Sequence, residues 1–198
     1  MSLSTLAALM LLVLLPVRGY GQDLSVFATG TVSEQLSDDT YVGPQGPYLD
    51  KPLAGTAIGI NAGLSAVAAN GVAVSVEFST ADLQVEQSGR LVGGRSTGEL
   101  RDTLISGLIG ARVRLASMSV TPLLGVTADV GGATRGNLTS DVGTFGVTGG
   151  VDFSPSSSAH VSFVATARYT YVFRPVSAAY AGIGPSIVRF GAGIRVRL

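Results

Sequence analysis

The only histidine in this sequence, His160, lies two residues before Ser162. A histidine can act as the general base that activates a serine hydroxyl for nucleophilic catalysis. The sequence has no cysteine, so disulfide bonds and thiolate ligands are excluded. One histidine is too few for a transition-metal cluster, and no G-x-G-x-x-G or P-loop motif is present. We therefore predict no metal site and no cofactor.

Arginines and acids occur at alternate positions in several apolar segments. Residues two apart in an extended strand point to the same face, so we expect these charged side chains to share one face. The set has six arginines and four acids, namely Asp23, Glu77, Arg112, Arg114, Asp129, Asp152, Arg168, Arg189, Arg195 and Arg197. Buried, they would form an ion-pair network held by forked arginine–carboxylate hydrogen bonds. The excess of arginine over acid alternatively suits a narrow, weakly anion-preferring pore.

These residues lie in eight segments that alternate apolar with small or polar residues, which predicts eight β-strands. The predicted strands are residues 23–33, 55–68, 72–81, 104–116, 120–130, 142–153, 161–173 and 188–198. In the last strand every even position from Val188 to Leu198 is apolar, and every odd position is Arg or Gly. The 27 glycines disfavour helix, since each costs a helix interior about 1 kcal/mol relative to alanine. The fold class is therefore predicted to be all-β.

The predicted connections alternate between short and long. Short connections follow the second, fourth and sixth strands, and Asn70-Gly71 in the first of them is a strong hairpin signal. The long connections are residues 34–54, 83–103, 131–141 and 174–185. This alternation predicts an up-and-down barrel with both chain ends beside the short turns. Glu77 and Arg168 would then lie near mid-height, and Asp129 and Arg189 toward the long loops. The other charged residues of the set would lie near the short turns. Pro122, near a strand start, would remove one ladder hydrogen bond.

The orientation of the strands decides between a membrane barrel and a soluble one. The segments are about 10–13 residues long, which suffices to cross a bilayer at a tilt of about 45°. Their polar face carries mostly Gly, Ala, Ser and Thr, with little charge for the exterior of a soluble protein. We therefore predict that the apolar face points outward to lipid and that the sheet closes, because unpaired backbone groups are costly in hydrocarbon. A lipocalin-like soluble barrel would have the opposite orientation.

The ends and the net charge complete the domain assignment. The apolar run from Leu6 to Val17 has the length of a signal-peptide core, and Gly19-Tyr20-Gly21 offers a small-x-small cleavage site. We predict a signal peptide at residues 1–21, although its start contains no Lys or Arg, and a barrel domain at residues 22–198. The 13 basic and 13 acidic residues form no basic block, so nucleic acid is not an expected partner.

The whole pattern resembles the small eight-stranded barrels of the Gram-negative outer membrane, such as the OmpA transmembrane domain and OmpX-like members of the porin family. The resemblance implies a location in the bacterial cell outer membrane and contact with its lipid. It also implies that the barrel-assembly machinery binds the C-terminal strand, through a signal formed by Phe190, Ile194, Val196 and Leu198. The resemblance is incomplete, because such barrels usually end in an aromatic residue, and this sequence has no tryptophan for an aromatic belt.

The function expected from these observations is structural. His160 and Ser162 also resemble the H-x-S pair of outer-membrane lipid A deacylases, which act with a glutamate. No glutamate follows Glu99, so we predict that the protein is not an enzyme. Exposed loops on a rigid barrel are suited to recognition. We predict a membrane scaffold that displays extracellular loops in a structural or adhesion-type role, with a plugged lumen and an unidentified loop ligand. The alternatives are a narrow passive pore for ions or small solutes, and a soluble periplasmic binding barrel.

Overall fold

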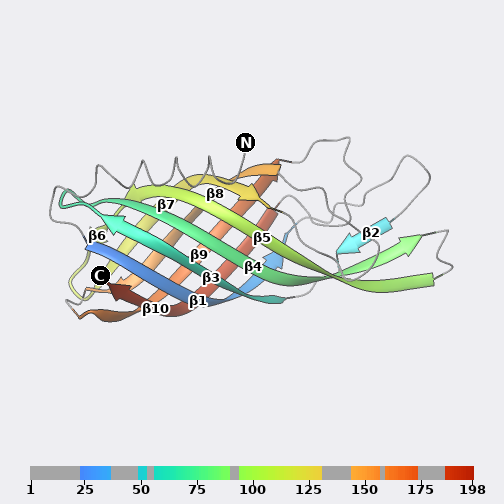
Figure 1. Ribbon diagram of the computed structural model, residues 1–198, viewed down its shortest axis with the longest axis horizontal. Coiled ribbons are helices and arrows are strands. Elements are labelled where there is room, and N and C mark those ends of the chain that lie inside the picture. The colour runs from blue at the N-terminus through green and yellow to red at the C-terminus, as the bar shows by residue number, and fades with distance from the viewer. Residues whose placement is uncertain are drawn as a thin grey trace.

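The computed structural model describes residues 23–36, 49–52, 56–89, 94–130, 144–156, 159–173 and 186–198. Within these ranges the chain forms ten strands (Figure 1). They are β1 (Asp23–Gln35), β2 (Leu49–Pro52), β3 (Ala57–Val67), β4 (Val72–Gly89), β5 (Gly94–Ala111), β6 (Val113–Arg114), β7 (Met118–Asp129), β8 (Thr144–Pro155), β9 (Val161–Phe173) and β10 (Ser186–Arg197). In the described ranges no helix has the length and apolar character needed to cross a membrane. The predicted signal peptide lies outside the described residues.

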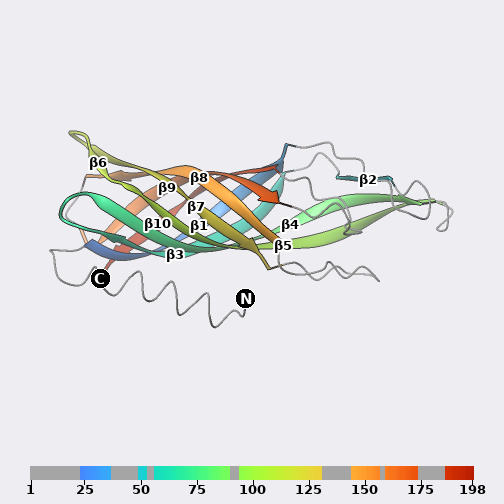
Figure 2. The same ribbon diagram turned by 90° about the horizontal axis from the view of Figure 1, so that it is seen from above.

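The eight long strands close into a barrel. Their order around the ring is β4-β3-β1-β10-β9-β8-β7-β5, and pairing of β4 with β5 completes the circle. All neighbours are antiparallel, and β1 pairs with both β3 and β10. The strands cross the barrel obliquely in both views (Figures 1 and 2). The predicted eight-stranded antiparallel barrel is confirmed.

The strand faces follow the alternation in the sequence. Leu124 on β7 is 64% exposed and Ile194 on β10 is 55% exposed, whereas Arg195 beside it is buried. Most inner positions are small or polar, but some apolar side chains also point inward. Phe27 on β1 is buried in the interior, and Leu108 and Leu123 pack with Val67 and Ala73. The apolar face is therefore outside, and the lipocalin-like orientation is wrong for this chain.

The turn between β3 and β4 forms where Asn70-Gly71 predicts a hairpin. Gly71 has φ of 87°, a left-handed conformation that glycine adopts without steric cost. The Asn70 side-chain oxygen accepts a hydrogen bond from the backbone N–H of Val72 at 3.1 Å. Near the same end of the barrel, the β5–β7 ladder stops at Gly110 and resumes with β6 at Val113. Pro122, which has no N–H to donate, lies in the interval on β7.

The connection expected at residues 83–103 differs from the prediction. β4 and β5 continue through most of it as paired strands, to a register of Gly89 opposite Gly94. The two strands extend beyond the rest of the barrel (Figure 2), and β2 pairs with the β4 arm. A hairpin outside the membrane has no need of a continuous apolar face, so its strands lack the alternation that identifies the others. We name the barrel end from which it projects the loop end, and the opposite end the short-turn end.

Candidate functional site

An ion pair joins opposite sides of the barrel interior. Glu77 lies on β4 and Arg168 on β9, and three strands separate β4 from β9 in either direction around the ring. Arg168 donates from Nη2 to Glu77 Oε1 at 2.5 Å and from Nε to Oε2 at 3.1 Å. Arg168 is 3% exposed and Glu77 is 4% exposed. This two-point geometry matches the planar guanidinium to the planar carboxylate and makes a strong, directional contact.

Further ion-pair contacts extend from Arg168 toward the short-turn end, through a second acid and a second arginine. Arg168 Nη2 contacts Asp152 Oδ1 at 2.6 Å, and Asp152 Oδ2 contacts Arg195 Nη2 at 2.7 Å. The remaining Arg168 Nη1 donates to the carbonyl oxygens of Val151 and Ala167, each at 3.1 Å. We name Glu77, Arg168, Asp152 and Arg195 the central network. Its formal charges cancel, which satisfies the requirement that buried charges be paired.

Neighbouring side chains complete the surroundings of the central network. Asn61 Nδ2 and Ser75 Oγ each donate to the Glu77 carboxylate at 3.3 Å. The guanidinium carbon of Arg195 lies 5.8 Å from the centroid of the Phe27 ring, within the range of a cation–π contact. Asn61, Ser75 and Phe27 are not among the site residues predicted from the sequence. Asn61 and Ser75 belong to the predicted inner face, but Phe27 breaks its polar pattern.

A chain of hydroxyl groups crosses four neighbouring strands beside the network. Ser106 on β5 and Thr127 on β7 lie 2.8 Å apart, Thr127 contacts Thr148 on β8, and Thr148 lies 2.8 Å from Thr170 on β9. Each hydroxyl can donate one hydrogen bond and accept another, so the chain satisfies polar groups without further charge.

The other predicted charged residues lie nearer the two ends. Toward the loop end, Arg189 donates to Ser79 Oγ at 2.7 Å and to Ser33 Oγ at 3.3 Å. Asp129 occupies an inner-face position at the loop end of β7, opposite Thr144. The remaining four charged residues, Asp23, Arg112, Arg114 and Arg197, lie at the short-turn end.

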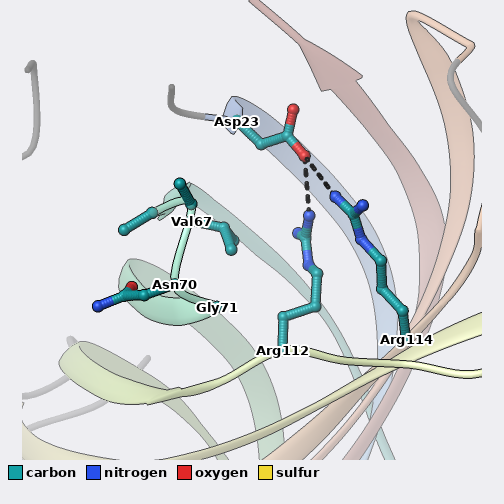
Figure 3. Close-up of a pocket in the computed structure, with 8 residues that line it drawn as sticks. Asp23, Val67, Asn70, Gly71, Arg112 and Arg114 are labelled. Carbon is teal, nitrogen blue, oxygen red and sulfur yellow. Dashed lines mark hydrogen bonds and ion pairs between the residues drawn. The ribbon is translucent and has the colours of Figure 1, made fainter. Parts of the chain in front are cut away.

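At the short-turn end, Asp23 is shared by three arginines. Its carboxylate lies 3.2 Å from Arg112, 3.8 Å from Arg114 and 3.1 Å from Arg197; Figure 3 shows the first two contacts. The pKa of Arg112 is lowered, mainly by burial and then by the positive charges of Arg195, Arg114 and Arg197. The negative charge of Asp23 acts in the opposite direction and raises this pKa. A cavity of about 420 Å³ and another of about 300 Å³ open beside this cluster. We name this region the arginine mouth.

The candidate catalytic pair also lies at the short-turn end. His160 is exposed in the turn before β9, and its carbonyl oxygen accepts the backbone N–H of Arg197 at 2.7 Å. Ser162 lines the 300 Å³ cavity. Among the described residues, no group of His, Cys, Asp or Glu could hold a metal ion.

Replacing Gly150 by alanine is expected to lower the free energy of unfolding by about 1–3 kcal/mol, the usual cost of overpacking. A Cβ atom at Gly150 on β8 would lie 2.7 Å from Arg168 Cδ and would also overlap the Ala167 carbonyl oxygen. Denaturant unfolding in lipid vesicles measures the effect. Gly30→Ala is the matched control, because nothing lies within 4 Å of a Cβ there. Equal stability of both variants would contradict the close approach.

Comparison with known proteins gives structural matches without sequence matches. No protein-family model and no curated protein sequence matches the chain significantly. The outer membrane protein OprG from Pseudomonas aeruginosa is similar in structure, with a TM-score of 0.57, 13% sequence identity, and coverage of 90% of this chain and 97% of OprG. Neisserial surface protein A (NspA) has a TM-score of 0.51, 14% identity, and coverage of 90% of this chain and 99% of NspA. The predicted bacterial outer-membrane location agrees with these matches and with the exposed apolar face. The chain has the fold of the small eight-stranded outer-membrane barrels.

Proposed function

We propose that this protein spans the bacterial outer membrane as a non-enzymatic scaffold that holds the loop-end segments outside the cell and whose lumen is closed by the central network. The main supporting observation is the Glu77–Arg168 pair, because it connects opposite strands of the ring. The interior of an eight-stranded barrel is just wide enough to be filled by side chains. In this proposal, the charge-neutral network occupies that space and blocks the passage of a hydrated ion.

The long β4–β5 hairpin supports the display role. It projects from the loop end, with β2 paired to its outer arm. A paired hairpin presents a more ordered surface than an unpaired connection, and a rigid barrel holds it at a fixed distance from the membrane. In this proposal the short-turn end faces the periplasm, and the assembly machinery binds the strand that carries Phe190, Ile194, Val196 and Leu198. These four positions remain a prediction from the resemblance.

The plugged lumen predicts electrical silence. Purified, folded protein in planar bilayers is expected to give no reproducible single-channel conductance, because the proposal places the central network across the lumen. Heat-modifiable gel mobility of the same sample shows that the barrel is folded. A reproducible conductance that changes in the Arg168→Ala variant would instead establish the narrow pore and reject the plug.

A further inference from the structure

The arginine mouth contains guanidinium nitrogens that have no hydrogen-bond partner among the described residues. The charged residues that line the 300 Å³ cavity are one acid, Asp23, and four arginines, Arg112, Arg114, Arg195 and Arg197. Asp23 contacts three of these arginines, and Asp152, the partner of Arg195, is also bound to Arg168. Among the described residues, the single carboxylate of Asp23 is therefore shared by three arginines of the mouth.

Individual donor atoms show the same deficit. Arg195 is buried, and its Nε and Nη1 have no hydrogen-bond partner among the described residues. Arg112 Nε is also buried without a partner there. A buried donor left unpaired costs about 1–3 kcal/mol, and more when the group is charged. These three atoms are shielded from solvent, so a ligand in the cavity would first meet the more exposed guanidinium groups of Arg114 and Arg197.

The neighbouring hydroxyl groups indicate the class of that ligand. Ser119, Ser154, Ser156 and Ser162 line the same cavity as the arginines. Guanidinium forks and hydroxyl donors together suit the several acceptor oxygens of a tetrahedral anion. We propose that the arginine mouth binds a phosphate group, either free or carried by a phospholipid headgroup. This inference does not depend on the lumen being plugged or on the loops having a partner.

Phosphate binding can be tested on the full chain, purified in a zwitterionic detergent. Titration calorimetry with inorganic phosphate is expected to show saturable binding that weakens as sodium chloride is added, because salt screens exposed charges. Arg114→Gln and Arg195→Gln are each expected to weaken binding about tenfold, the loss of one charge-assisted contact. Arg114 is the safer variant for folding, because its side chain is 73% exposed and its contact with Asp23 is 3.8 Å long.

Arg189→Gln is the matched control, because Arg189 lies toward the loop end and contacts Ser33 and Ser79. It is expected to change phosphate affinity less than twofold. Native mass spectrometry after purification with phosphatidylglycerol separates the two sources. Binding of inorganic phosphate supports a free ligand. A phospholipid headgroup is supported if the parent protein retains phosphatidylglycerol but does not bind inorganic phosphate, and if Arg114→Gln no longer retains the lipid. Binding of neither probe, or equal binding by the parent, Arg114→Gln and Arg195→Gln, would overturn the proposal.

Discussion

Replacing Glu77 by glutamine is expected to lower the free energy of unfolding by about 3–5 kcal/mol, the usual cost of removing one partner from a buried ion pair. Arg168 would keep Asp152 as a partner, but its charged two-point contact with Glu77 would be replaced by at most one hydrogen bond to the neutral glutamine amide oxygen. The central network would then hold two arginines and one acid, leaving an uncompensated charge between the strands. Reversible urea unfolding in lipid vesicles measures the effect. Circular dichroism is a suitable signal because the chain has no tryptophan.

Two further variants separate this charge effect from a general loss of packing. Glu34→Gln makes the same chemical change at an exposed position, where surface substitutions are usually within about 0.5 kcal/mol of neutral. The double variant Glu77→Met, Arg168→Met removes both charges and leaves Asp152 paired with Arg195. It is expected to recover most of the stability lost in Glu77→Gln, because apolar residues can replace a buried pair at little cost. A loss below 1 kcal/mol in Glu77→Gln itself would show that the pair does not stabilise the barrel.

The face on which each strand residue lies could be predicted because a period of two directly encodes sidedness. Ile194 and Arg195 illustrate this, since one is exposed and its neighbour is buried. The sequence does not encode which inner residues meet across the barrel. Glu77 and Arg168 are 91 positions apart, and their contact depends on closure of the ring and the stagger of its strands. The sequence alone therefore predicted the set of charged residues but not the pairing within it.

Two further features could not be predicted from the alternation of apolar and polar residues. The β4–β5 hairpin continues past the membrane-spanning part, where neither face has to contact lipid, so its residues resemble those of a loop. Phe27 is apolar but points inward, where it lies beneath Arg195. The alternation assigns apolar residues to the outer face, so Phe27 is an exception to it. The contact with Arg195 gives a reason for its inward position, and this contact could not be predicted from the sequence.

The outward orientation itself predicts the second large effect. Leu124→Arg is expected to lower the free energy of unfolding in a bilayer by about 2–4 kcal/mol, the cost of arginine on the lipid face near the membrane midplane. Leu124 is 64% exposed near the middle of β7, in a position where a soluble barrel would tolerate a charge. Vesicle unfolding in urea measures the change.

The depth dependence of this cost distinguishes lipid contact from packing. Val161→Arg places the same side chain on the outer face at the start of β9, near the short turns. Its expected cost is about 0–1 kcal/mol, because arginine near the interface can extend to water and headgroups. A packing defect would depend on local neighbours and not on height along the strand. Equal costs at Leu124 and Val161 would therefore be incompatible with a hydrocarbon layer around the barrel, whereas a larger cost at Leu124 would locate its centre.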